Sequence, residues 1–125
     1  MILFVHYFIV NNINMIEQVF DNCIIKVGEN AIENQALLES SNLNDLWVHI
    51  SNYPSAHAVI SMKNGVCRKK TRKLIKRACC IVKSKSSKCK SMNKVLFDIC
   101  KVQDLTLTDI PGKVIIHDNY RNITI

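Results

Sequence analysis

The segment from Lys63 to Lys94 contains 13 lysine and arginine residues and no aspartate or glutamate. It cannot neutralise its own charge, so its side chains must face water, an acidic partner or phosphate groups. A solvated helix face is one interpretation, but this excess of cations is more than solubility requires, and neutralising nucleic-acid phosphates is its commonest use. We therefore predict a nucleic-acid-binding surface here. Its candidate residues are Lys69, Lys70, Arg72, Lys73, Lys76, Arg77, Lys83, Lys85, Lys88 and Lys90.

Trp47, His49 and His57 form a second group of candidates. They fall at alternate positions of two strands that are predicted to pair, so an indole and two imidazoles should lie side by side on one face. Aromatic side chains on a sheet can stack on unpaired bases, and we include the three among the predicted nucleic-acid contacts. The alternative is a buried cluster with its ring nitrogens satisfied by neighbours. For Trp47 burial is favoured, since a lone strand tryptophan is usually buried; for the histidines both interpretations stay open.

The four histidines and six cysteines form no recognisable catalytic or metal-binding pattern. No nucleophile elbow, HExxH motif, paired carboxylates or glycine-rich phosphate loop occurs. The cysteines have no CxxC spacing and are not combined with histidines as in zinc fingers. We therefore predict no catalytic residue, no metal site, no cofactor and no enzyme activity, with the cysteines as reduced thiols.

The chain length of 125 residues fits one domain, residues 1–125. Its charge is divided, because residues 1–62 carry a net −5 and residues 63–125 a net +12. The apolar opening segment, residues 1–10, is too short for a transmembrane helix, which needs about 20 residues, and it lacks the features of a signal peptide. We expect a buried strand there, and a cytoplasmic protein.

The elements that must position these residues are predicted from periodicity and turn residues. We expect strands at 2–10, 15–20 and 24–27, with turns at 11–12 and 21–22, then a helix at 31–39 with Asn30 as N-cap. A hairpin of 46–51 and 57–62 follows, then a helix from 70 to about 84, a mobile basic loop at 85–94, a strand at 95–102, and a closing hairpin of 114–117 and 122–125. The predicted class is α+β, an antiparallel sheet with two helices.

Side-chain alternation assigns the two faces of the central hairpin. If Ser51 opposes His57, one face holds Trp47, His49, Ser51, His57, Val59 and Ser61, and the other, which must be core, holds Leu46, Val48, Ile50, Ala58, Ile60 and Met62. The basic helix should bury a stripe of Leu74, Ile75, Ala78, Cys79 and Val82.

Four segments resemble the NFACT-R domain, the RNA-binding module of the NFACT proteins of ribosome-associated quality control. Residues 25–34 are similar to its hydrophobic-x-V-G-x-N-A-x-x-N pattern, and residues 45–49 with 54–59 to its D-L-W-F-H and P-G-S-H-V-V pair. Residues 78–85 resemble the helix that ends in Y-S-K, and residues 111–115 the P-G-x-V close. Lys83 replaces the frequent tyrosine, Ser55-Ala56 replace Gly-Ser, and residues 105–109 lack the usual lysines, so the basic patch is predicted to lie on the helix and its loop instead.

The resemblance implies a free-standing RNA-binding domain whose partner is a tRNA or the large ribosomal subunit. Two other classes are compatible with the charge: a DNA-binding module, since phosphate contacts do not distinguish the two sugars, and a protein-interaction domain for an acidic partner. The sequence leaves the oligomeric state open, and it gives no indication of membrane binding.

Overall fold

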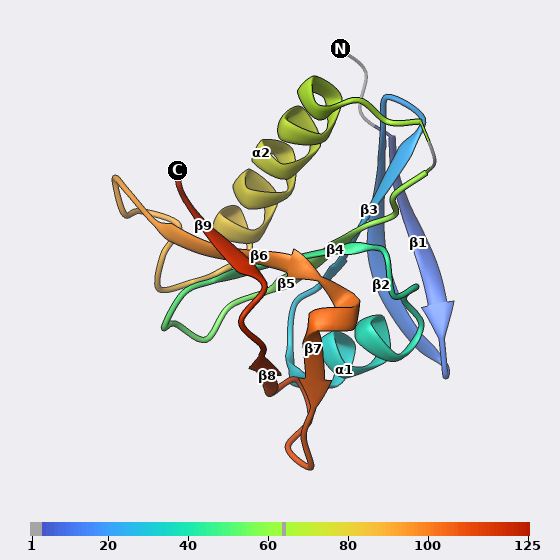
Figure 1. Ribbon diagram of the computed structural model, residues 1–125. Coiled ribbons are helices and arrows are strands. Elements are labelled where there is room, and N and C mark those ends of the chain that lie inside the picture. Colours follow the sequence, from blue (N-terminus) through green and yellow to red (C-terminus); the bar gives the residue numbers. More distant parts are fainter. Residues whose placement is uncertain (1–3, 64) are drawn as a thin grey trace.

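The computed structural model describes residues 4–63 and 65–125 (Figure 1). Their strands are β1 (Phe4–Val10), β2 (Ile13–Phe20), β3 (Cys23–Gly28), β4 (Leu46–Ile50), β5 (His57–Ile60), β6 (Leu96–Lys101), β7 (Leu105–Leu107), β8 (Val114–Ile116) and β9 (Tyr120–Thr124). The helices are α1 (Ala31–Glu39), α2 (Arg68–Ser84) and the short 3₁₀ helix η1 (Val102–Asp104). Seven strands form an antiparallel sheet in the order β1-β2-β3-β5-β4-β6-β9, and β7 and β8 pair separately. The predicted α+β class is confirmed.

Strands β1, β2 and β3 form the predicted meander. Two-residue turns at 11–12 and 21–22 connect them, and all four turn residues have φ between 50° and 65°. Positive φ at both central positions defines the type I′ turn, whose twist matches that of the strands and which asparagine and aspartate tolerate. The local sequence therefore dictates this part of the sheet.

The two faces of the large sheet are covered by different elements (Figure 1). Helix α2 packs across β3, β4 and β5, and the predicted apolar stripe is buried there. Helix α1 covers the opposite face together with apolar side chains of β7 and β8. Neither helix of the described residues has the length and apolar character needed to cross a membrane.

Helix α1 begins at the predicted N-cap. The Asn30 side chain accepts a hydrogen bond from the backbone N–H of Glu33 at 2.9 Å, and the Glu33 carboxylate accepts one from the backbone N–H of Glu29 at 3.1 Å. This reciprocal capping satisfies backbone donors that a helix start leaves unpaired. The capping determines where α1 begins after β3, next to the site described below.

The face assignment of the β4–β5 hairpin is confirmed, although the expected register is wrong by two residues. His57 pairs with His49, not with Ser51. The backbone N–H of Ile50 donates to the Ser55 hydroxyl and that of Ser51 to the Leu96 carbonyl on the other side of β4, so these groups do not continue the ladder to β5. A shift of two residues preserves alternation, so every side chain stays on its predicted face.

The predicted closing hairpin is wrong, because β8 and β9 do not pair with each other. Strand β8 pairs with β7, where Val114 and Ile116 pack toward α1, while β9 pairs with β6 at the edge of the large sheet. Ile123 and Ile125 pack against the α2 side of the sheet. The two strands therefore serve different cores, which a local turn signal cannot reveal.

The expectation of a buried first strand is also wrong. Strand β1 forms the outer edge of the large sheet, and Tyr7 and Ile9 are 71% and 69% exposed. Phe8 and Val10, which point to the other face, are half-buried against the core beneath α1. Residues 2 and 3 of the predicted strand lie outside the described residues.

Candidate nucleic-acid interface

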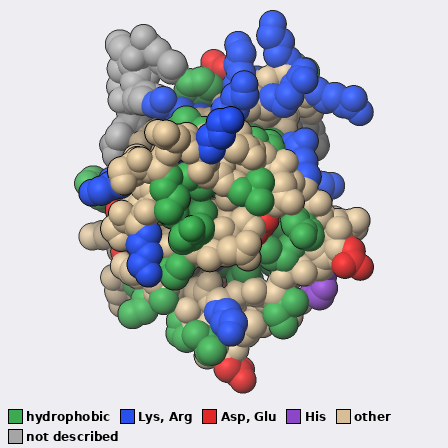
Figure 2. All heavy atoms as spheres, turned by 90° about the vertical axis from the view of Figure 1, so that its left-hand side faces the viewer, with side chains coloured by type: hydrophobic (Ala, Val, Ile, Leu, Met, Phe, Trp, Pro, Cys, Tyr) green, Lys and Arg blue, Asp and Glu red, His purple; other side chains and the backbone are tan. Residues whose placement is uncertain are grey.

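Helix α2 presents a basic face opposite its buried stripe. Arg68, Lys69, Arg72, Lys73 and Lys76 are exposed and follow the three- and four-residue spacing of one helix side. Figure 2 shows lysine and arginine side chains gathered at the end of the molecule where α2 begins. Within residues 4–63 and 65–125, an ion pair is found only between Lys85 and Glu29, at 3.9 Å. The basic face of α2 therefore carries charge that no acidic side chain of the described protein balances.

Some predicted contact residues are less accessible than the α2 face. Lys70, Arg77 and Lys83 are half-buried. The Arg77 guanidinium lies 5.9 Å from the centre of the Phe20 ring, and its Nε is buried without a hydrogen-bond partner among the described residues. Arg77 therefore has a packing role between α2 and β2, in addition to any contact with phosphate.

The predicted mobile loop at 85–94 is instead a series of hydrogen-bonded turns anchored to the core. Ser86 is buried, donates to the Val82 carbonyl at 2.6 Å and accepts from the Ala56 N–H at 3.1 Å. Cys89 is fully buried, so the turns hold Lys88 and Lys90 exposed on either side of it. The buried side chains of Ser86 and Cys89 anchor the segment. The prediction of a mobile loop was based on its lysines and not on these two residues.

Trp47, His49 and His57 come together as predicted, but they do not form an exposed platform. The Trp47 indole is fully buried, is stacked on the His49 ring at 5.3 Å with a 9° interplanar angle, and donates from Nε1 to Nδ1 of His57 at 3.0 Å. His57 is 3% exposed, whereas His49 is half-buried. The prediction that bases stack directly on Trp47 or His57 is therefore wrong, because α1 and the β7–β8 hairpin cover this face of the sheet.

Both imidazoles are neutral at physiological pH. Burial lowers the pKa of His49 from 6.5 to about 4, against the opposing effect of the Asp98 carboxylate. Burial also lowers the pKa of His57 to about 3, and the neighbouring His49 adds to the decrease. Because Nδ1 of His57 accepts the indole hydrogen, its proton must lie on Nε2. Among the described residues the His57 Nε2 has no hydrogen-bond partner, and this atom is not fully buried.

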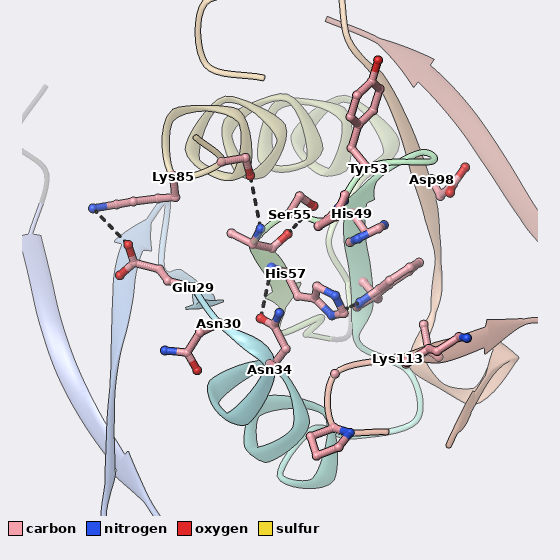
Figure 3. Close-up of a pocket in the computed structure, with 18 of the residues that line it drawn as sticks. Glu29, Asn30, Asn34, His49, Tyr53, Ser55, His57, Lys85, Asp98 and Lys113 are labelled. Atoms are coloured by element: carbon pink, nitrogen blue, oxygen red, sulfur yellow. Dashed lines mark hydrogen bonds and ion pairs between the residues drawn. The ribbon is translucent and has the colours of Figure 1, made fainter. Parts of the chain in front are cut away.

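These rings line a cleft of about 730 Å³ (Figure 3). Its walls come from the start of α1, the β4–β5 loop, the residues after α2, and the loop between β7 and β8. Figure 3 shows the side chains of Asn34 and His57 near its middle, with Lys85 and Lys113 at opposite sides. The cleft and the contributions of Asn34, Tyr53, Ser55 and Lys113 were not predicted, because five segments far apart in the sequence form it: residues 29–34, 47–57, 85–87, 98 and 111–116.

Gly28 explains how the cleft is held together. It pairs with His57 across β3 and β5, and the Asn34 side chain accepts a hydrogen bond from the His57 N–H at 3.3 Å. A Cβ atom on Gly28 would overlap the Asn34 carboxamide oxygen and lie 2.9 Å from its backbone nitrogen. The Gly-x-Asn-Ala-x-x-Asn spacing thus places Asn34 against the strand that carries His57.

Replacing Gly28 by alanine is therefore expected to destabilise the domain by about 1–3 kcal/mol, the usual effect of forcing extra atoms into a packed site. Urea denaturation measures this change, and amide hydrogen exchange at His57 reports the loss of its contact with Asn34. Alanine at Gly65, where a Cβ meets nothing within 4 Å, serves as a comparison that adds strain from a φ of +86° but no overlap. Equal stability of G28A and the unmodified chain would contradict the packing role.

Comparison with known families identifies the domain. The family model described as the NFACT protein RNA binding domain matches residues 4–118. The chain belongs to this family. No curated protein matches the chain significantly. Among solved structures, the C-terminal part of the fibronectin/fibrinogen-binding protein from Streptococcus suis is similar, with a TM-score of 0.73 and 21% identity.

That likeness concerns the fold. It covers 87% of this chain and 43% of the streptococcal one, so the chain spans less than half the length of that structure. The architecture of an NFACT RNA-binding domain is therefore shared by a much longer chain, whose further segments have no counterpart in these residues.

Proposed function

We propose that this NFACT RNA-binding domain is a non-catalytic module that holds the phosphate backbone of a tRNA or ribosomal RNA, in the cytoplasm, along the basic face of α2. The observation that carries the proposal is this face itself, with five exposed basic residues and no acid in the helix. Membership of an RNA-binding family favours RNA over other polyanions. Lys88 and Lys90 are exposed in the turns that follow α2 and add two more cations beyond the end of the helix.

The position of the charges on the helix supports an anionic ligand. Arg68, Lys69 and Lys70 open α2, and its first turn contains no acidic residue. The N-terminus of a helix already carries a partial positive charge, so cations there are unfavourable until an anion approaches. Phosphate groups would relieve this repulsion and release counterions at the same time.

Replacement of Lys69, Arg72, Lys73 and Lys76 by glutamine tests the proposal. Each lost phosphate contact should reduce the slope of log affinity against log salt by about one, so the fourfold variant should lose about three to four. Arg77 is left intact because it packs on Phe20. Filter binding of tRNA at several salt concentrations gives the slopes.

The control variant replaces Lys101 and Arg121 by glutamine. Both are exposed basic residues, on β6 and β9, at the edge of the sheet opposite β1. It should change the slope much less for each charge removed. If the α2 variant kept the affinity and slope of the unmodified chain while remaining folded, the α2 face would be only a solvated surface. Parallel titrations with duplex DNA and polyglutamate distinguish the alternatives, since equal or tighter binding of either would reassign the surface.

A further inference from the structure

We infer that the cleft beneath the β4–β5 loop takes the base of one unpaired RNA nucleotide, with the nucleotide's phosphate at its cationic rim. The inference rests on the proposed function, because it gives a second and more selective role to a site beside the backbone-binding surface. Four features of the cleft support it: its size, its chemistry, its distribution of charge and its location.

The size and lining of the cleft fit a single small heteroaromatic group. Its volume of about 730 Å³ lies within the range of small-molecule sites, roughly 300–1,000 Å³. His49 lines the cleft and is half-buried, while its stacked partner Trp47 is fully buried, so His49 is the more accessible residue of this aromatic pair. Histidine is among the side chains on which splayed-out RNA bases stack.

The interior of the cleft is polar, and both of its imidazoles are neutral. Neutral His57 keeps an Nε2–H donor without a partner among the described residues, and the imidazole of neutral His49 offers both a donor and an acceptor. The Asn34 amide nitrogen likewise has no hydrogen-bond partner among the described residues, while its oxygen holds the His57 backbone. Neutral donors and acceptors match the edge of a nucleobase. Among the described residues no group of three His, Cys, Asp or Glu side chains is placed to hold a metal ion instead.

Four charged residues line the cleft, two lysines and two acids. Lys113 is exposed and Lys85 is 38% exposed, with Glu29 as its only acidic partner in the described part of the chain. Asp98, the other acid of the lining, is 7% exposed and accepts a hydrogen bond from Asn122 at 2.7 Å. The two ammonium groups, at opposite sides of the cleft, are the groups that would hold the phosphate of a nucleoside monophosphate whose base lies beside the neutral imidazoles.

The cleft lies at the C-terminal end of α2, the helix whose first half carries the basic face. Lys85, Ser86 and Ser87 line it, and they directly follow the last residue of α2. An RNA whose phosphates follow α2 toward its C-terminal end therefore reaches the mouth of the cleft. A nucleotide there that is unpaired, or that forms a chain end, can enter the cleft without breaking a base pair.

Mononucleotide titration of the full chain tests the inference directly. Trp47 is the only tryptophan of the chain and lines the cleft, so its fluorescence reports occupancy. Adenosine, guanosine, cytidine and uridine 5′-monophosphates are compared with ribose 5-phosphate and inorganic phosphate. We expect at least one nucleotide to change the fluorescence in a saturable way, with both base-free phosphates weaker by about fivefold to a hundredfold, the usual contribution of one stacked base.

Two matched variants locate the effect. Ser87 lies in the cleft lining and Ser91 outside it, and both are exposed in the turns after α2. Ser87→Phe should abolish the nucleotide response, whereas Ser91→Phe should retain it. The same pair should differ in preferring an RNA hairpin with one unpaired 3′ nucleotide over the same hairpin with a blunt end.

The outcomes separate this inference from the proposed function. A fluorescence response without dependence of RNA affinity on α2 charges would support the cleft and remove the backbone surface. An α2-dependent salt slope without any nucleotide response up to millimolar concentrations would support the surface and overturn the cleft. Equal behaviour of the two phenylalanine variants, or equal responses to nucleotide and ribose 5-phosphate, would also overturn it.

Discussion

Replacing Trp47 by alanine is expected to lower the free energy of unfolding by about 3–5 kcal/mol, the range found for large aromatic side chains in protein cores. The indole is fully buried between β4 and α1, in the core formed with Leu37 and Val59. Its loss also leaves Nδ1 of His57 without a donor, which adds to the cost. Denaturation by urea or heat measures the change.

Phenylalanine at position 47 separates the two contributions. Trp47→Phe keeps an aromatic ring in the core but removes the hydrogen bond to His57. Its expected cost is about 1–3 kcal/mol, the penalty for a buried group left unpaired, and is therefore smaller than that of the alanine variant. Since small domains are stable by only about 5–15 kcal/mol, the alanine variant should be substantially unfolded at elevated temperature. A loss below about 1 kcal/mol for alanine would contradict the burial of the indole and revive an exposed stacking role for it.

Period-two alternation predicted correctly which residues of the central hairpin share a face, and the structure shows that both faces are covered. Trp47 and Val59 face the core beneath α1, while Val48, Ile50, Ala58 and Ile60 face the core beneath α2. A wrong register by two residues did not disturb this assignment, since side chains two positions apart share a face. What the alternation could not show was that the Trp47 face is covered as well, because its cover comes from α1 and β7–β8.

Long-range pairing set the limit of prediction at the C-terminal end. The short polar connection between the predicted strands 114–117 and 122–125 suggested a local hairpin, yet the chain crosses there from the small sheet to the large one. Strand β9 is placed by pairing with β6 and by packing of Ile123 and Ile125, partners that lie 20 or more residues away. Such tertiary contacts override a local turn signal.

The cleft could be predicted only in part, for the same reason. Its aromatic and histidine residues share one hairpin face, so their proximity follows from the sequence. The Gly112 loop that closes it was not predictable. Its N–H donates to the Gln35 side chain at 3.1 Å, and with a φ of +79° its Cα lies so close to Ala31 that a Cβ would be 2.9 Å from the Ala31 Cα. Only the folded chain brings residues 35 and 112 together.

Acidification below about pH 6.5 should destabilise the domain because two buried histidines resist protonation in the folded state. Burial holds the pKa of His49 at about 4 and that of His57 at about 3, both below the 6.5 of an unfolded histidine. The folded protein keeps both rings neutral while the unfolded chain takes up protons, so stability is complete above pH 6.5 and decreases as the pH falls toward the folded pKa values. The slope is about 1.4 kcal/mol per pH unit for each proton, or about 2 kcal/mol per histidine at pH 5.

A double variant that cannot titrate at these positions isolates the effect. Asparagine at position 57 can still offer an acceptor to the Trp47 indole, and glutamine at position 49 retains a planar polar group beside it. The free energy of unfolding of His49→Gln/His57→Asn should change much less between pH 7 and pH 5 than that of the unmodified chain, even if it is lower at pH 7. NMR titration of the imidazole carbon-bound protons gives an independent measurement, in which neither ring should titrate above pH 5. A ring that titrates near pH 6.5, or an unchanged pH slope in the double variant, would show that burial does not hold these imidazoles neutral, and their role as neutral donors and acceptors in the cleft would have to be abandoned as well.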